Sequence, residues 1–118
     1  MNYFTIKELT KSSNAARLGI DNTPSAATVA NLNNLIAKVL NPARKKLGCP
    51  IIVNSGYRSP ALNLSVGGAK KSYHLQGRAA DLNAGTKAQN RALYAILKEL
   101  PHTELINEKD ATWIHVAL

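Results

Sequence analysis

The feature that most constrains the fold is one long segment with helical periodicity. It begins at the helix-start pair Thr23-Pro24 and ends before Gly48. Within it, apolar side chains recur at helical spacing, at Val29, Leu32, Leu35, Ile36, Val39, Leu40 and Leu47. We therefore predict a main helix over residues 24–47 with an apolar stripe that faces the core. Pro42 lies inside this helix and should kink or tighten it locally, because proline lacks a backbone N–H.

The other predicted elements are short. We expect helices over residues 6–9, 12–18, 59–66 and 86–100, several of them opened by a Ser or Thr that can cap them. We expect a short buried strand over 51–53, a second over 78–83, and a terminal hairpin of 104–108 and 113–118 around the turn 109–111. This order is typical of an α+β fold with a small, largely antiparallel sheet flanked by helices. A chain of 118 residues has room for one core, so we predict a single domain over 1–118.

Composition limits the partners of this chain more than it limits the fold. The hydrophobic fraction of 45% and charged fraction of 19% indicate a globular chain. Fifteen Lys and Arg against seven Asp and Glu give a net charge of +8, which favours a nucleic acid, an anionic membrane or an acidic cell-wall polymer as partner. The apolar runs are too short for a membrane span, and the N-terminus lacks the apolar stretch of a signal peptide.

The chain has one cysteine, Cys49, which excludes an intrachain disulfide and a cysteine-based zinc site. It lies where the chain turns into the predicted strand at 51–53. We predict an inert, buried thiol at this position, since lone cysteines are mostly buried.

Asp81 is the acidic residue with the most unusual surroundings, because it lies in a strand-like, largely apolar run. A buried carboxylate needs a hydrogen bond, an ion pair or a metal. His74 precedes it on a loop, and Gly77 allows a tight turn between them. His115 points away from the core if its strand neighbours point inward. Two histidines and one carboxylate with an open fourth position form a catalytic zinc arrangement, although a lone strand histidine is more often structural.

Three motifs in order resemble the signature of the M15 peptidases. They are Ser55-Gly56-Tyr57-Arg58-Ser59, then Ser72-x-His74-x-x-Gly77-x-Ala79-x-Asp81, then Trp113-Ile114-His115. The likeness runs from Phe4 to Leu118 and is nearest to the short, M15A-like members. It implies a hedgehog/D-Ala-D-Ala peptidase-like fold. It also implies Zn²⁺-dependent hydrolysis of a peptidoglycan stem peptide, as in D-alanyl-D-alanine carboxypeptidases or phage L-alanyl-D-glutamate endolysins.

Carried over by position, the resemblance implies roles for five residues. His74, Asp81 and His115 would be the zinc ligands. Arg58 would hold a substrate carboxylate or the transition-state oxyanion, for which a permanently charged, planar guanidinium is suited. Ser72 would hydrogen-bond near the metal or the substrate. The structural alternatives are a surface arginine after a turn for Arg58 and a loop-closing hydroxyl for Ser72.

The expected general base is where this sequence departs from the family pattern. The best-known members carry Asp or Glu three residues before the last histidine ligand, and that position here is Thr112. Glu108 and Asp110 are the two nearby acids that we consider as replacements. We favour Glu108, because it ends one arm of the hairpin whose other arm carries His115. Asp110 is expected to be a solvated turn residue.

The missing acid at position 112 also supports a different interpretation, in which the chain is a weak or inactive zinc-fold module that binds cell wall. A nucleic-acid binder rests on charge alone, and we expect no nucleic-acid partner because no such motif is present. We expect a monomer that acts on peptidoglycan peptides at the cell wall, with Lys70 and Lys71 helping it to dock. The scissile bond stays open, as does the choice between a bacterial enzyme and one encoded by a phage and released at lysis.

Overall fold

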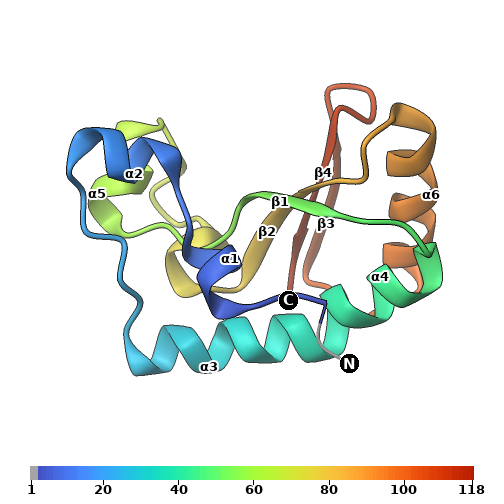
Figure 1. Cartoon of the computed structure of the whole chain (residues 1–118), viewed down its shortest axis with the longest axis horizontal. Coiled ribbons are helices and arrows are strands. Elements are labelled where there is room, and N and C mark those ends of the chain that lie inside the picture. Colours follow the sequence, from blue (N-terminus) through green and yellow to red (C-terminus); the bar gives the residue numbers. More distant parts are fainter. Residues whose placement is uncertain (1–2) are drawn as a thin grey trace.

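The computed structural model describes residues 3–118 and has an α+β fold built on an antiparallel sheet (Figure 1). The strands are β1 (Ile52–Ser55), β2 (Ala79–Asn83), β3 (Glu104–Glu108) and β4 (Trp113–Ala117), in the spatial order β1-β2-β4-β3. The helices are α1 (Ile6–Thr10), α2 (Ser13–Leu18), α3 (Ala26–Leu35), α4 (Asn41–Leu47), α5 (Pro60–Ser65) and α6 (Lys87–Lys98), with a π-helical segment η1 (Ile36–Leu40) and a 3₁₀ segment η2 (Tyr73–Gln76). The predicted fold class is confirmed.

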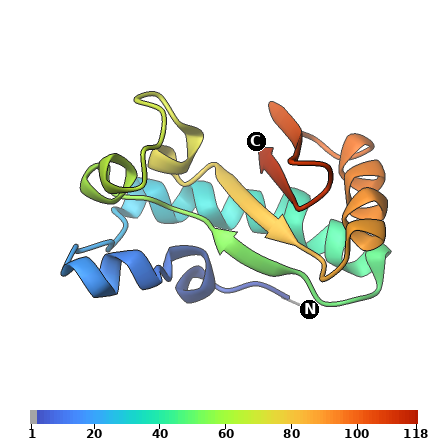
Figure 2. The ribbon, with the colours of Figure 1, turned by 90° about the horizontal axis from the view of Figure 1, so that it is seen from above.

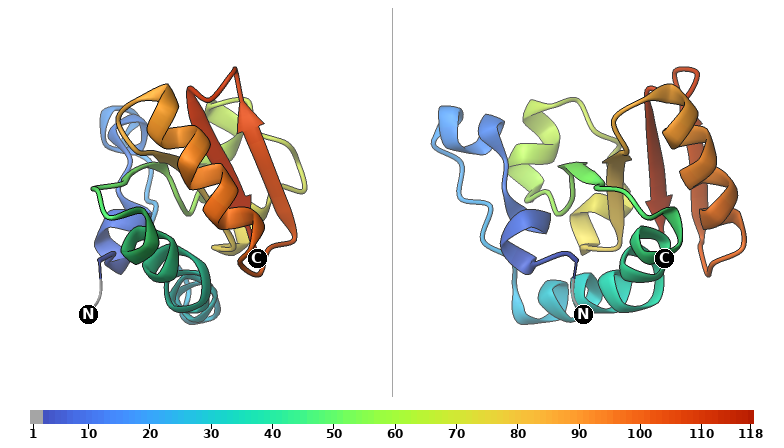
Figure 3. Two further views of the ribbon diagram at one scale, coloured as in Figure 1. Left: turned by 90° about the vertical axis from the view of Figure 1, so that its right-hand side faces the viewer. Right: turned by 45° about the vertical axis from the view of Figure 1, so that its right-hand side comes forward.

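Helices cover one face of the sheet and leave the other face to the candidate site. α3 runs beneath the sheet and continues through η1 into α4, while α6 lies alongside the β3–β4 hairpin (Figures 2 and 3). The core joins the apolar stripe of the main helix to inward-facing strand residues, among them Leu82, Ile114 and Val116. Because strand side chains alternate between faces, Asp81 and His115 point away from this core.

The main helix differs from the prediction at its start and in its middle. It begins at Ala26, two residues later than predicted, because the hydroxyl of Ser25 accepts the N–H of Thr28 and serves as the cap. Around Pro42 the helix widens into η1, where the N–H of Asn41 donates to the carbonyl of Ile36, five residues earlier. Proline has no N–H to continue the regular ladder, which accounts for the predicted distortion.

Two burial predictions near β1 were wrong. Ile52 is 61% exposed, although its neighbour Ile51 is buried, because β1 is an edge strand with β2 as its sheet neighbour. Cys49 is half-buried, and its Sγ donates to Oε1 of Gln89 at 2.9 Å. An edge strand keeps a half-exposed face, so an apolar sequence run did not imply full burial here.

The end of the hairpin is fixed from α6 by a buried amide. Asn90 is 1% exposed, and its Nδ2 donates to the carbonyl of Ala111 in the hairpin turn at 2.8 Å. Its Oδ1 accepts the N–H of Ala84, just after β2, at 2.7 Å. One side chain thus links the end of β2 to the hairpin that contains β4. Within residues 3–118, none of the helices has the length and apolarity needed to span a bilayer.

Candidate metal centre

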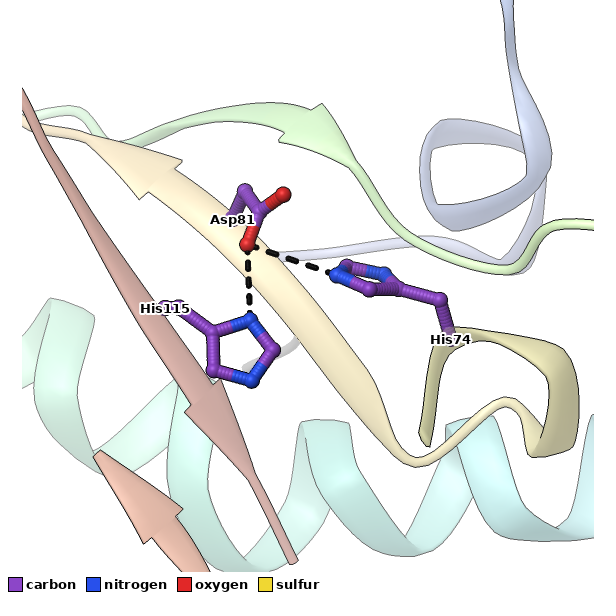
Figure 4. Close-up of side chains that lie close together, drawn as sticks. All are labelled: His74, Asp81 and His115. Carbon is purple, nitrogen blue, oxygen red and sulfur yellow. Dashed lines mark hydrogen bonds and ion pairs between the residues drawn. The ribbon is translucent and has the colours of Figure 1, made fainter. Parts of the chain in front are cut away.

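His74, Asp81 and His115 converge in the structure (Figure 4). His115 lies directly opposite Asp81 in the antiparallel pairing of β2 and β4. Oδ1 of Asp81 is 2.9 Å from Nδ1 of His115 and 3.4 Å from Nε2 of His74. One ligand atom from each residue lies within 4.8 Å of the others, so the three sequence-predicted ligands are brought to one point.

The position of His74 is set by the short η2 segment. The hydroxyl of Ser72 accepts the N–H of His74 at 3.1 Å and caps this segment. Gly77 ends it with φ of +70°, and a Cβ there would lie 2.8 Å from the carbonyl oxygen of Thr28. Nδ1 of His74 is 2.7 Å from the carbonyl oxygen of Gly56, which can only accept, so Nδ1 carries the proton. In the neutral ring that a metal ligand requires, the lone pair of Nε2 then faces Asp81.

Asp81 and His115 attract each other strongly. Burial alone would raise the pKa of Asp81, but hydrogen bonds from His115 and His74 hold that pKa well below its ordinary value. Burial would lower the pKa of His115, but hydrogen bonds to Asp81 and Glu104 raise it above its ordinary value. A metal ion at this position replaces a proton on His115, because a ligand nitrogen must offer a lone pair.

Arg58 borders the candidate ligands. Its Nη2 lies 3.4 Å from Oδ2 of Asp81, and its Nε donates to the hydroxyl of Ser55 at 2.9 Å. Nη1 donates to Oδ1 of Asn63 at 3.3 Å. The guanidinium is therefore fixed on three sides and mostly buried, rather than a free surface arginine. Of the two interpretations of Ser72, the structure shows the loop-closing hydrogen bond, while the residue also lines the cavity described next.

A cavity of about 350 Å³ opens over these residues. Its lining includes Arg58, Ser72, Glu104, Ile106, Glu108 and Trp113 beside the three candidate ligands. Glu108 pairs with Trp113 across the hairpin and faces this cavity. Within residues 3–118 its carboxylate makes no hydrogen bond or ion pair. Asp110 is different: its side chain is 76% exposed and lies 3.7 Å from Lys87 and 3.4 Å from Arg91, outside the cavity lining.

Comparison with known proteins agrees with this geometry. A family model described as Peptidase M15 matches residues 2–117. The chain belongs to the M15 peptidase family. It is also 48% identical over 65 residues to the zinc D-Ala-D-Ala carboxypeptidase of Streptomyces albus G. That alignment covers 53% of this chain and 25% of the carboxypeptidase, so the match spans about a quarter of the relative's length. The family predicted from the sequence motifs is confirmed.

The donor set of this M15 peptidase fits a zinc ion. Two imidazole nitrogens and one carboxylate oxygen point at a common position, and the cavity leaves room for a further ligand. Zinc in catalytic sites takes three protein ligands of these types and keeps a fourth position for water or substrate. Asp81 also carries a charge-neutralising partner, Arg58, as buried ligating carboxylates commonly do.

Sequence reasoning missed one acidic residue of the site. Oε1 of Glu104 lies 2.8 Å from Nε2 of His115, on the ring edge opposite Asp81. In the hairpin register Ile106 pairs with His115, so Glu104 and Glu108 flank that position on the same face of β3. The spacing of the two glutamates places both on one face of the strand, but it does not indicate which of them lies beside His115.

Proposed function

We propose that this chain is a zinc-dependent peptidase that hydrolyses a peptide bond of the peptidoglycan stem, with residues 1–118 forming one catalytic domain. The observation that carries the proposal is the convergence of His74, Asp81 and His115 beside an unpaired glutamate, Glu108, in one cavity. Membership of the M15 family supports the reaction class. The name of the carboxypeptidase relative supports both the metal and the substrate class.

In this proposal the three converging residues hold the zinc ion. Nε2 of His74, the carboxylate of Asp81 and Nδ1 of His115 are the atoms that face one another and would serve as ligands. Zinc would supply Lewis-acid chemistry, polarising the scissile carbonyl and acidifying a water molecule. Arg58, itself held by the hydroxyl of Ser55, would keep Asp81 in place as a ligand.

Glu108 is proposed as the general base. Its carboxylate would take the proton of the attacking water and later give it to the leaving amine. Its place in the cavity lining satisfies the first requirement of a base, which is reach. Arg58 would supply N–H donors to a substrate carboxylate or to the developing oxyanion. Ser72 would add a hydrogen bond to the substrate, because its oxygen accepts the N–H of His74 and its own proton stays available to donate.

Our proposal for the scissile bond rests on the activity of the carboxypeptidase relative and not on the shape of the cavity. The relative is a D-Ala-D-Ala carboxypeptidase, which favours removal of the terminal D-Ala over endopeptidase cleavage between L-Ala and D-Glu. Both bonds lie in the cell wall, and the net charge of +8 suits docking on that anionic polymer.

The decisive experiment incubates the purified protein with muropeptides that carry a pentapeptide stem, with and without a chelator, and then restores zinc. We expect turnover that is lost with the chelator and regained with zinc. Mass spectrometry of the products separates release of one D-Ala from cleavage inside the stem. No turnover with any muropeptide at full zinc occupancy would contradict the proposal.

A second candidate function is a cell-wall-binding module without catalysis. The observation that favours it is Thr112, which stands where the best-known family members carry the catalytic acid. It predicts that the zinc-loaded protein sediments with purified cell walls and releases no product. Release of product by the wild type but not by Glu108→Gln would rule it out.

A further inference from the structure

The two histidines of the metal centre present different ring nitrogens to Asp81. His74 uses Nε2, with Nδ1 bonded to the backbone of Gly56, whereas His115 uses Nδ1, with Nε2 bonded to Glu104. A neutral imidazole has one N–H and one lone pair, so the partner of one nitrogen determines what the other can do.

In His74, the carbonyl oxygen of Gly56 determines which ring nitrogen carries the proton. Because Gly56 can only accept a hydrogen bond, Nδ1 carries a proton, and in the neutral ring the lone pair is on Nε2. Within residues 3–118 the ring of His115 has no comparable backbone partner, and both of its nitrogens face carboxylates. Once Nδ1 serves a metal, the remaining proton must stay on Nε2, and Glu104 is the acceptor placed to hold it there at 2.8 Å.

We propose that Glu104 is a positioning residue that accepts the Nε2–H of His115 and so fixes the ring with Nδ1 toward the metal. The inference rests on the zinc site proposed above. A carboxylate behind a ligating histidine fixes both its tautomer and its ring orientation, and losing such a partner commonly costs about 10- to 100-fold in metal affinity. Glu104 does not touch the reacting atoms in this scheme, and Glu108 keeps the role of base.

The position of Glu104 suits this task. It lies on β3 four residues before Glu108 and on the same face, so both side chains reach the cavity. The side chain of Glu104 is 42% exposed while that of His115 is 11% exposed. Truncating Glu104 therefore removes the hydrogen bond without opening the core.

The test compares Glu104→Ala and Glu104→Gln with matched changes at Glu108, using zinc affinity as the main readout. Competition with a chromophoric chelator gives the zinc dissociation constant. We expect a loss of about 10- to 100-fold for Glu104→Ala. We expect nearly wild-type affinity for Glu104→Gln, whose amide oxygen can still accept the Nε2–H. Glu108→Ala and Glu108→Gln should bind zinc as the wild type does, and equal melting temperatures of the metal-free variants would exclude a folding defect.

A second readout is the tautomer itself. Long-range ¹H–¹⁵N correlation of the zinc-loaded wild type should show the proton on Nε2 of His115 and on Nδ1 of His74. The inference is overturned if His115 carries its proton on Nδ1, if Glu104→Ala binds zinc as tightly as the wild type, or if Glu104→Gln loses as much affinity as Glu104→Ala. A wild type that binds no zinc would overturn the proposed function as well. A loss of turnover in Glu104→Gln at unchanged zinc affinity would move the role of base to Glu104.

Discussion

The two histidines of the candidate metal centre are held by different parts of the molecule. His74 belongs to a short 3₁₀ segment and faces Asp81, and it is held there by the backbone of Gly56 and the capping hydroxyl of Ser72. His115 belongs to a strand of the sheet, and its ring is held by the carboxylates of Asp81 and Glu104. One candidate ligand is thus fixed by loop conformation and the other by ionisable side chains.

We call His74 with its turn, and His115 with the carboxylates around it, the two halves of the site. The difference indicates which kind of substitution would disturb each half. The His74 side depends on a turn that must close correctly, so it is sensitive to backbone strain. The His115 side depends on strand register, which the sheet already specifies, and on charges that side-chain substitutions can remove. Asp81 contacts both histidines and joins the two halves.

The largest effect is expected from Asp81→Asn, which weakens both halves at once. The substitution removes the negative charge that faces both histidines and Arg58. We expect zinc affinity to fall by more than the roughly 100-fold typical of losing an outer partner, and peptidase activity to fall to background. Asp110→Asn on the exposed turn is the matched control and should leave zinc affinity unchanged. Comparable zinc binding by Asp81→Asn and the wild type would show that Asp81 is not a ligand.

The next effect concerns Glu108, which contacts neither histidine. Glu108→Gln keeps the shape of the side chain and removes its basicity. We expect kcat to fall by about 10²- to 10⁴-fold, with zinc affinity unchanged. The measurement is turnover of a muropeptide at saturating zinc. If kcat stays within twofold of the wild type, the base lies elsewhere.

A glycine pair tests the loop that carries His74. Gly77 and Gly67 have nearly the same backbone φ angle, +70° and +71°. Their surroundings differ, because a Cβ at Gly77 would lie 2.7 Å from Cγ2 of Thr28, while a Cβ at Gly67 would have nothing within 4 Å. Alanine at either position pays about 1–2 kcal/mol for the left-handed conformation. Gly77→Ala should lose a further 1–3 kcal/mol, on the order of an overpacked core site. Urea unfolding of the metal-free protein measures both, and equal losses would mean that the turn yields without strain.

The sequence predicted the parts of this fold that depend on local patterns. Thr5, Ser59 and Thr86 cap helices where their spacing indicated, and the hairpin turn joins the strands that were predicted. The convergence of the three candidate ligands was also predictable in part, because alternation along β4 placed His115 opposite to its core-facing neighbours.

What the sequence did not reveal depends on contacts between distant segments. The main helix starts after Ser25 rather than at Thr23-Pro24, because the hydroxyl of Ser25 accepts the N–H of Thr28. The exposure of Ile52 depends on which strand lies at the edge of the sheet. Glu104 became visible only through the register of β3 against β4, since no rule of spacing distinguishes an acid behind a ligand from an acid on the surface.

The smallest effect is expected at Ser72, where stability and substrate binding can be separated. Ser72→Ala removes the oxygen that accepts the N–H of His74. Losing a cap of this kind costs about 1 kcal/mol, which urea unfolding detects. Thr86→Ala at the start of α6 removes an equivalent cap far from the cavity lining and is the control. If Ser72 acts through the turn alone, both variants lose similar stability and KM for muropeptides is unchanged. A rise in KM confined to Ser72→Ala would instead show that this hydroxyl also contacts the substrate. The His74 half of the site would then contribute to substrate binding as well as to metal ligation.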